Sequence, residues 1–536
     1  MNTKSEFLLY GLGILTAILL RCGVSLHPYS GAGKPPMYGD YEAQRHWMEI
    51  TVNLPITDWY RNTSTNDLQY WGLDYPPLTA YHSYLCGVVS LFINPEYVSL
   101  TKSRGYETEE HKLFMRYTVL LVDLLLFIPA AVVYFKSVYK KNPKKSLITP
   151  SLGTLLTLLY PGLILIDHGH FQYNCVSLAF AVYAILFVCT RRPVLGSICF
   201  CLALNYKQME LYHAIPFFVY LLSTCIPKPG QSALVGVTRL AKISGTVILT
   251  FAVIWAPFLI NVSSTFDVLR RLFPVARGIF EDKVANVWCT LNVFYKLKLY
   301  IGNEQMFRYC TVATFVAVLP SSIDLFLRPN VKKFVIALIN SSLAFFLFSF
   351  QVHEKTILVV ALPVMLYLPV EPIVCFWFLI LSVFSMVPLL LKDELMVATI
   401  SLVLFYIVLF YIICEYRPGC NNEMFFPRYD NVIQLISDTK KSGHYRLLLR
   451  TFRKHYKTLL TMGRSLLIIA SLSGCALFVA LILIFHPPMN YPDLFSLIIS
   501  IYSCFHFLAF FIYFNFVQFN IPPAVEDIKH FKFKSD

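Results

Sequence analysis

The sequence predicts an all-α membrane protein that crosses the bilayer many times. Of its 536 residues, 57% are hydrophobic and only 14% are charged, a composition far from that of soluble proteins. Apolar runs of roughly 16 to 25 residues recur along the whole chain, long enough to cross a hydrocarbon core of about 30 Å as helices. The strands of a membrane barrel would instead show alternating apolar and polar residues.

The charge pattern argues against a nucleic-acid partner, and the cysteine spacing argues against a metal site built from cysteines. The net charge is +14, but most basic residues lie in short clusters between apolar runs, where the positive-inside rule accounts for them. We therefore expect no nucleic-acid partner. The 14 cysteines are scattered, mostly inside apolar runs, with no C-x-x-C pair and no metal-like spacing, and we interpret them as small buried hydrophobic residues.

The first half of the chain predicts seven helices. The first run, 7–26, is longer than the apolar core of a signal peptide and has no clear cleavage site, so it is predicted to remain as a helix. A long outer loop, 27–113, follows, and the run 114–134 returns to KSVYKKNPKKS, whose five lysines indicate the cytosol. Further runs lie at 147–166, at 175–190, on both sides of NYKQMELYH and at 243–260.

The second half raises the predicted number to about fourteen transmembrane helices. A second outer loop, 261–306, precedes two helices that flank RPNVKK, and the second of them ends at FQVHEKT. This count places both termini and a basic loop, 415–463, in the cytosol. We therefore divide the chain into a catalytic transmembrane module, 1–360, and C-terminal transmembrane helices, 361–536. The last five runs lie at 357–368, 374–391, 395–414, 466–485 and 495–516.

Short signals indicate the endoplasmic reticulum membrane. Lys532 and Lys534 stand fifth and third from the end, the K-x-K-x-x arrangement of a retrieval signal that is read from the cytosol. Sequons at Asn62 and Asn261 fall on the outer face, which would then be the lumen, whereas the sequon at Asn340 falls inside a predicted helix. We predict a multi-pass protein in contact with the lipids of this membrane.

The dense polar motifs share the outer face, which predicts a luminal active site built from several loops. Solvation alone would make loops polar, but it would not gather His168, His170 and Gln172 at one helix end. The two histidines, with Asp167 beside them, lack a firm third ligand, so we expect no metal there. The motifs are GDYEAQRHW, QYWGLDYPPLTAYHSY, DHGHFQYN, RLFPVARGIFEDKVANVWC and FQVHEKT.

Asp40 is the carboxylate predicted to take part in chemistry. Its i,i+5 spacing from Arg45 suits a salt bridge poorly, whereas Glu42 and His46, at i,i+4, are better placed to pair with each other. Asp74 precedes Tyr-Pro-Pro, where an aspartate suits a turn as well as a substrate contact. Asp40 is thus the carboxylate with the fewest local partners.

Six cationic residues on the outer face run against the positive-inside trend. They either face lipid headgroups or hold a phosphate at the bilayer boundary, since arginine binds phosphate bidentately and lysine as a point charge. A lipid-borne phosphate beside a carboxylate base suits transfer of a sugar from a polyprenyl phosphate to a hydroxyl group, with inversion at the anomeric carbon. The six are Arg270, Arg271, Arg277, Lys283, His353 and Lys355.

Five motifs in order resemble one enzyme family. It comprises the glucosyltransferases of the endoplasmic reticulum that use dolichyl phosphate glucose in asparagine-linked glycosylation. The resemblance is greatest to the branch that adds the first, α-1,3-linked glucose to dolichyl-pyrophosphate Man9GlcNAc2. It covers Tyr38 to Leu358, about three fifths of the chain. The motifs are YGDYEAQRHWMEIT, DLQYWGLDYPPLTAYHSY, DHGHFQYN, FPVARGIFEDKVANVWC and FSFQVHEKTIL.

The resemblance implies a GT-C fold with a long first luminal loop whose early aspartate, here Asp40, is the catalytic base. It also implies dolichyl β-D-glucosyl phosphate as donor, a dolichyl-pyrophosphate-linked oligosaccharide as acceptor, inversion, and no metal or other cofactor. The substrate-binding residues are our own prediction. Arg277, His353 and Lys355 are preferred for the donor phosphate, and the further candidates are His168, His170, Lys283, Asp74 and Glu42.

Other functions stay open from the sequence. The sister branch that adds the second glucose is similar, and a mannosyltransferase that uses dolichyl phosphate mannose would share the architecture and the base. A lipid or sugar transporter is disfavoured because few charged residues, Arg21 and Asp123 among them, lie within the spans and no inverted repeat is apparent.

Overall fold

The computed structural model describes residues 3–139, 147–227, 229–273, 283–415, 433–434 and 455–522, and these residues form helices and no strand. Nine helical segments among them are long and apolar enough to cross a membrane, which confirms the all-α polytopic class. They are α1 (Thr3–Ser25), α4 to α5 (Glu109–Val122 and Ile128–Tyr139), α6 to η5 (Pro150–Leu158 and Leu165–Phe171), α11 (Ala233–Leu259), α15 (Asn303–Leu327), α16 (Val331–Phe348), α20 (Met396–Glu415), α23 (Tyr456–Ile484) and α24 (Leu494–Asn520).

Shorter helices complete the bundle and lie where the apolar runs predicted them. Fourteen as the number of crossings stays a prediction, because several of these helices have fewer than 18 residues. They are α8 (Asn174–Cys189), α9 (Pro193–Tyr206), α10 (Leu211–Cys225), α17 (Ile357–Tyr367), α18 (Pro372–Phe384) and α19 (Val387–Lys392); α13 (Val287–Tyr295) and α14 (Leu297–Tyr300) lead into α15.

Three predicted runs are not single regular helices. The run 147–166 breaks after α6 and resumes at Pro161 in α7 (Pro161–Ile164), since proline suits the first turn of a helix but not its interior. It then passes into the π-helical segment η5. The run 374–391 breaks between α18 and α19. The third run, 114–134, is interrupted by another π-helical segment, η3 (Asp123–Phe127), which joins α4 to α5.

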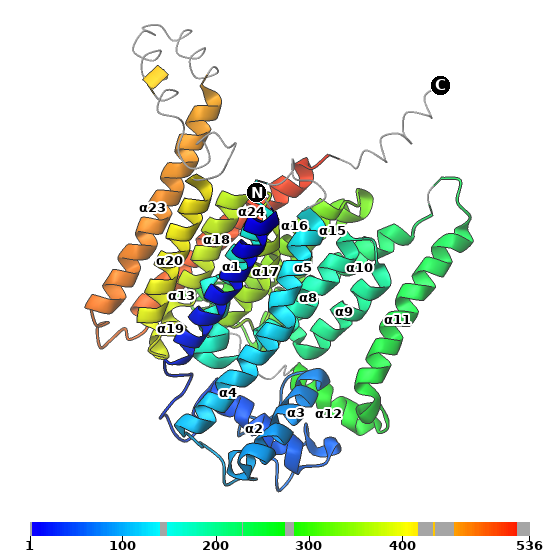
Figure 1. Ribbon diagram of the computed structural model, residues 1–536, viewed down its shortest axis with the longest axis vertical. Helices are drawn as coiled ribbons and strands as arrows, with labels where there is room; N and C mark the ends of the chain where they lie inside the picture. The colour runs from blue at the N-terminus through cyan, green and yellow to red at the C-terminus, as the bar shows by residue number, and fades with distance from the viewer. Residues whose placement is uncertain are drawn as a thin grey trace.

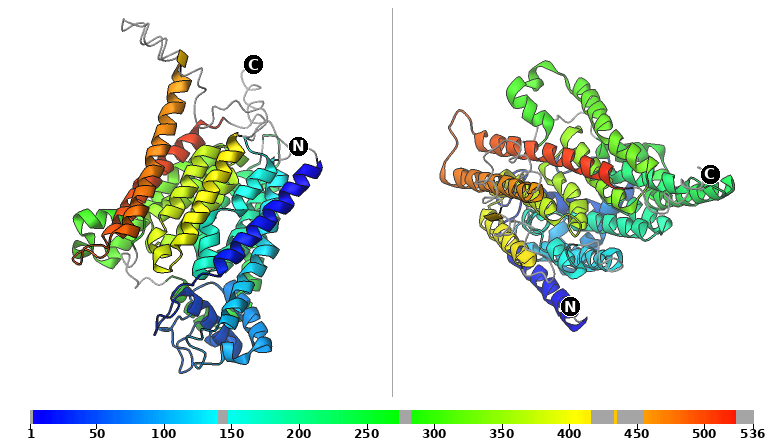
Figure 2. Two further views of the ribbon diagram at one scale, coloured as in Figure 1. Left: turned by 60° about the vertical axis from the view of Figure 1, so that its left-hand side comes forward. Right: turned by 90° about the horizontal axis from the view of Figure 1, so that it is seen from above.

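The buried centre of the bundle consists of α8, α16, α17 and α18, whose side chains are almost all inaccessible. α24 packs against α16 and α18, so the C-terminal helices contact the predicted catalytic module directly. α23 stands at the edge of the bundle beside α24 (Figures 1 and 2). The division of the chain at residue 360 stays a prediction.

A cap, formed by residues 26–108, lies beyond one end of the bundle (Figures 1 and 2). It contains α2 (Asp40–Asn53), η1 (Ile56–Asp58), α3 (Pro77–Ile93) and η2 (Pro95–Val98), and α12 (Val262–Leu272) packs beside it. Trp47 and Ile50 of α2 share a hydrophobic core with Phe258 of α11 and Val268 of α12. α1 begins and α24 ends on the opposite side of the bundle (Figure 1).

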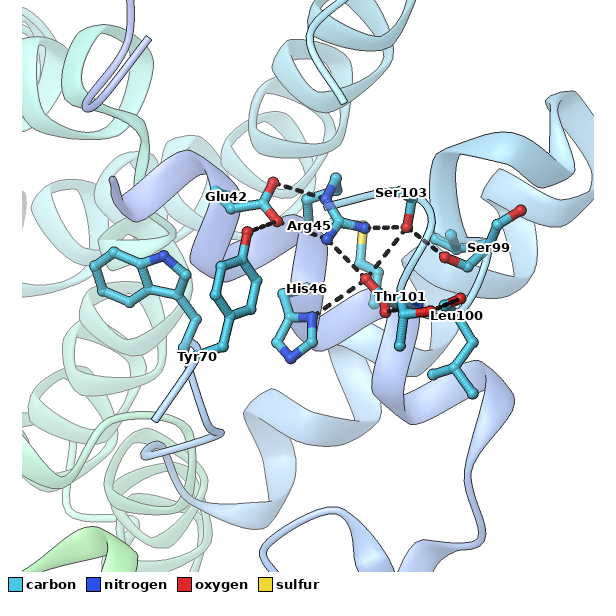
Figure 3. A network of polar contacts seen from close by, with 12 residues as sticks. Glu42, Arg45, His46, Tyr70, Ser99, Leu100, Thr101 and Ser103 are labelled. Carbon is cyan, nitrogen blue, oxygen red and sulfur yellow. Dashed lines mark hydrogen bonds and ion pairs between the residues drawn. The ribbon is translucent and has the colours of Figure 1, made fainter. Parts of the chain in front are cut away.

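A buried ion-pair network fixes α2 within the cap (Figure 3). The Arg45 guanidinium is inaccessible and donates to both oxygens of Glu42, at 2.8 and 2.6 Å, and to Glu49 at 2.7 Å. It also donates to the Ser103 hydroxyl at 2.6 Å, while the Tyr70 hydroxyl donates to Glu42 at 2.7 Å. Each buried charge is therefore paired and hydrogen-bonded, as its removal from water requires.

The pairing predicted for this helix is wrong. Glu42 pairs with Arg45 at i,i+3, and His46 pairs with Glu49 rather than with Glu42. Burial alone would raise the pKa of Glu49, but the hydrogen bond from His46 and the charge of Arg45 outweigh it and lower that pKa to about 2. A forked guanidinium can bridge two carboxylates that lie one turn before it and one turn after it, which an imidazole cannot do.

Replacing Arg45 with leucine should destabilise the cap by about 3–5 kcal/mol, because two buried carboxylates lose their partner. The measurement is equilibrium unfolding of the purified protein in detergent. Arg61→Leu is the matched control, since Arg61 is 55% exposed and lies 3.8 Å from Asp267, where an ion pair contributes about 1 kcal/mol or less. Equal effects of the two changes would contradict the structural role of Arg45.

Candidate active site

A cavity of about 210 Å³ lies where the cap meets the bundle. Segments far apart in the sequence line it: the start of α2, the turn after η5, the segment η6 (Gln208–Glu210) and the segment η7 (Glu354–Thr356). The charged and amide side chains in its lining include Asp40, Asp74, Gln172, Asn174, Lys207, Arg271, His353 and Lys355. The cavity thus presents both cations and carboxylates at the end of a hydrophobic bundle.

Asp40 is the first residue of α2, and its position depends on the glycine before it. A Cβ atom on Gly39 would lie 2.4 Å from the Ser30 carbonyl oxygen, so only glycine allows this close approach. Ser30 in turn donates its backbone N–H to the carbonyl of His170 at 3.1 Å. The sequence Gly-Asp therefore sets the carboxylate against the end of η5.

The hydrogen bonds that described side chains make to the Asp40 carboxylate all fall on one oxygen. Oδ2 lies 3.0 Å from His170 Nε2 and accepts from the Gln172 amide and from the Lys355 ammonium. Among the residues that the structure describes, none donates to Oδ1. Burial would raise the pKa of Asp40, but Lys355 and His170 outweigh it and hold this pKa well below its usual range. These two partners keep the carboxylate ionised at neutral pH.

Lys355 reaches Asp40 from η7, after the end of α16. Its Nζ atom also lies 3.1 Å from His170 Nε2, so the ammonium contacts two members of the cluster. Burial would lower the pKa of Lys355, but the Asp40 carboxylate outweighs it and raises that pKa. Both residues are therefore charged over the physiological pH range, which makes this corner of the cavity a strong ion pair.

Lys207 fixes the orientation of Gln172. Its Nζ atom donates to Gln172 Oε1 at 2.9 Å and to Asn174 Oδ1 at 2.7 Å. An ammonium only donates, so the oxygen of the Gln172 amide faces Lys207 and the NH2 group is left to face Asp40. Burial lowers the pKa of Lys207 to about 8, although the Asp167 carboxylate opposes this shift.

The structure brings five of the predicted site residues to the same cluster or cavity. Asp40, Lys355 and His170 are in contact, and His353 and Asp74 line the cavity. The Asp74 carbonyl accepts a hydrogen bond from Gln208 at 3.0 Å, which ties the cap to η6. Arg277 lies outside the described residues.

Three other candidates lie away from the cavity lining. Glu42 belongs to the network around Arg45 (Figure 3). His168 is buried inside the bundle, with Nε2 3.0 Å from Asp123, which also pairs with Arg21 at 2.5 Å. Lys283 lies 2.5 Å from Asp493, near the start of α24. Each has a carboxylate or guanidinium partner, and the structure gives none of them direct access to a ligand in the cavity.

Comparison with known proteins now identifies the family. Residues 17–513 match the model of the ALG6, ALG8 glycosyltransferase family. The chain belongs to this family. It is 47% identical to the dolichyl pyrophosphate Man9GlcNAc2 alpha-1,3-glucosyltransferases of Gallus gallus and Rattus norvegicus, over 94% of this chain and 95% of each relative. It is 46% identical to a protein of Drosophila melanogaster named as a probable enzyme of the same kind, over 94% and 97% of the two chains.

Membership of the ALG6, ALG8 family shows that the protein is a glycosyltransferase, as the five motifs suggested. Two residues around Asp40 were not predicted from the sequence: Lys207, and Asp393 after α19, whose Oδ2 atom lies 2.5 Å from His170 Nδ1. Lys207 stands in the NYKQMELYH turn, and a lone lysine on the outer face was the available signal, since it departs from the positive-inside trend. In the described ranges, no group of three or more metal-ligating side chains is placed to hold a metal ion.

Lys207→Met should lower the rate of glycosyl transfer about tenfold, because the Gln172 amide is then free to turn away from Asp40. In the unmodified protein, the ammonium is present below about pH 8 and is lost as the pH rises through that value. A decline in rate above pH 8 is therefore expected, and Lys207→Arg should abolish it because arginine stays charged. Identical pH profiles for the lysine and arginine forms would contradict this role.

Proposed function

We propose that this glycosyltransferase moves glucose from dolichyl β-D-glucosyl phosphate to dolichyl-pyrophosphate-linked Man9GlcNAc2, forming an α-1,3 linkage with inversion. The family match and the names of the relatives at 47% identity support this substrate pair. The observation that carries the chemical part is Asp40, whose Oδ2 atom is fixed by three side chains while Oδ1 has no donor among the described residues. This is the arrangement that a single general base needs.

In the proposed step, the acceptor hydroxyl attacks the anomeric carbon of glucose from the face opposite the phosphate. Its proton passes to Oδ1 of Asp40 as the new C–O bond forms. The bond between the anomeric carbon and the phosphate oxygen breaks, and dolichyl phosphate leaves with the electron pair. Since phosphate is a weak base, no acid is needed on that side. A single displacement of this kind inverts the configuration from β to α.

Basic side chains of the cavity suit the charge that develops on the leaving phosphate. Lys355 and His353 line the cavity, and Arg277 is the further candidate from the sequence. When a donor phosphate binds, it competes with Asp40 for the Lys355 ammonium. The pKa of Asp40 then rises toward its usual value, since Lys355 is the strongest influence that holds it down against burial. The base thus gains strength when the donor is in place.

We also propose that the cap faces the lumen of the endoplasmic reticulum and that both termini are cytosolic. The exposed side chains of Asn62 and Asn261 lie in the cap and at the start of α12, where a luminal glycosylation enzyme would reach them. Asn340 is buried in α16 and suits no such modification. The retrieval motif at Lys532 and Lys534 lies outside the described residues, and membrane lipids surround the apolar helices.

The substrate pair can be tested with purified protein, defined lipid-linked sugars and Asp40→Asn as the control variant. Transfer should occur from dolichyl phosphate glucose to the Man9GlcNAc2 acceptor, and the asparagine form should lose about 10²- to 10⁴-fold in rate because it keeps the shape and removes the base. Transfer from the mannose donor alone, or only to the monoglucosylated acceptor, would overturn the substrate assignment. Near-normal turnover by Asp40→Asn would overturn the role of Asp40.

Lys355→Met should raise the KM for the donor. It should also move the acid limb of the pH profile of kcat/KM to higher pH. Asp40 acts while ionised, and its low pKa keeps it ionised at acid pH in the unmodified protein. Without Lys355, burial raises that pKa, so kcat/KM falls at a higher pH as the medium is acidified. Lys298→Met, which removes an exposed lysine in α14, is the control and should change neither quantity. If kcat/KM fell at the same pH in Lys355→Met as in the unmodified protein, the pairing of Lys355 with Asp40 would be contradicted.

A further inference from the structure

Asp393 reaches the active-site cluster from the C-terminal part of the chain. It follows α19, and its carboxylate is 98% buried. Its Oδ2 atom lies 2.5 Å from Nδ1 of His170, whose other nitrogen, Nε2, lies 3.0 Å from Asp40 Oδ2. The His170 ring therefore stands between two carboxylates that are 353 positions apart in the sequence.

The turn that carries Asp393 has a defined geometry. Glu394 has φ of +61°, in the left-handed region, and the backbone N–H groups of Glu394 and Leu395 donate to the carbonyls of Leu391 and Leu390 at 3.1 and 2.9 Å. These bonds close the end of α19 and direct the chain into α20. Lys34 of the cap donates to the carbonyl of Lys392 at 3.2 Å, so the turn is also tied to the cap.

The charges of the cluster determine the state of His170. An ionised carboxylate only accepts hydrogen bonds, so an imidazole that bonds to one at each nitrogen donates from both and is an imidazolium. The charged groups that face the ring are Asp40 from α2, Asp393 from the turn after α19, and Lys355 from η7. Asp40 and Asp393 thus balance the charges of Lys355 and of a protonated His170, and the Lys207 ammonium lies next to this group, on Gln172.

We propose that Asp393 is a positioning residue for the transfer reaction. It holds His170 as a doubly protonated donor in one orientation, so that Nε2–H stays on Oδ2 of Asp40 and Oδ1 stays directed at the acceptor hydroxyl. This inference rests on the proposed function of Asp40 as the base. Asp393 touches no reacting atom. It gives the C-terminal helices a part in the site, which the 1–360 module alone would not contain.

The proton balance is consistent with this role. His170 keeps both of its protons throughout, and the acceptor proton resides on Oδ1 of Asp40 after the glycosidic bond has formed. Before the next turnover, that proton leaves to water in the cavity. Nothing in the step requires proton transfer through His170, so Asp393 acts by charge and orientation, as carboxylate partners of catalytic histidines do.

The test compares Asp393→Asn with Glu394→Gln, which removes a carboxylate from the exposed neighbouring position. The asparagine form should lose about 10- to 100-fold in kcat at pH 7.5, with little change in donor KM. Its rate should recover as the pH falls toward 5.5, because acid restores the imidazolium that Asp393 otherwise maintains. The unmodified enzyme and Glu394→Gln should show no such recovery. Asp393→Glu keeps the charge and should keep the unmodified pH profile.

Each outcome of this test either supports or overturns the positioning role of Asp393. An unchanged kcat in Asp393→Asn, or a loss that is the same at every pH, would overturn the proposal, since a merely structural residue gives the second result. If Asp393→Asn does not yield folded protein, Asp393→Glu decides: a kcat and a pH profile close to those of the unmodified enzyme would support the charge argument, and a loss of kcat, whether acid restores it or it is the same at every pH, would contradict it. Full activity of Asp40→Asn would remove the proposed base itself, a failure distinct from that of Asp393.

Discussion

The partial burial of one carboxylate is the constraint on which the site depends. The Asp40 side chain is only 20% exposed, and loss of most of its hydration is unfavourable unless donors replace the lost water. Three donors do so, and they come from η5, from the turn that follows it and from η7. The cap and the bundle are therefore joined at the point where the negative charge is needed, and the same contacts that permit its burial also fix its orientation.

The hydrophobic bundle makes this arrangement rigid without taking part in chemistry. Inside it, Arg21, Asp123 and His168 form a second buried charge cluster, beside two π-helical segments. An extra residue in a helical turn changes the direction of the side chains that follow it. In η5 this places His168 beside Asp123 of the bundle and His170 beside Asp40 of the cap, so one short segment links the ion pairs inside the bundle to those of the cavity.

Hydropathy predicted the helices well because a span needs only length and apolar composition, and both are local properties of the sequence. The breaks at Pro161 and at α19 were less visible, since they interrupt runs that stay apolar. Asp40, Lys355 and His170 were found through their motifs. Lys207 and Asp393 were missed because their partners lie at least 33 positions away, and the Glu42–His46 pairing was wrong because a guanidinium competes better than an imidazole for two carboxylates.

The strength of the Lys355–Asp40 pair has a consequence for the order of events. A carboxylate held so far below its usual pKa is a poor base, so an acceptor hydroxyl that arrives alone meets little driving force for proton transfer. Lys355 and His353 line one cavity with Asp40, so a phosphate that enters there reaches the ammonium and the carboxylate together. In the proposed mechanism, binding of the donor then releases Asp40 from its strongest partner. Water in the empty cavity faces the less basic carboxylate, which suits an enzyme that has to transfer its sugar to an alcohol and not to water.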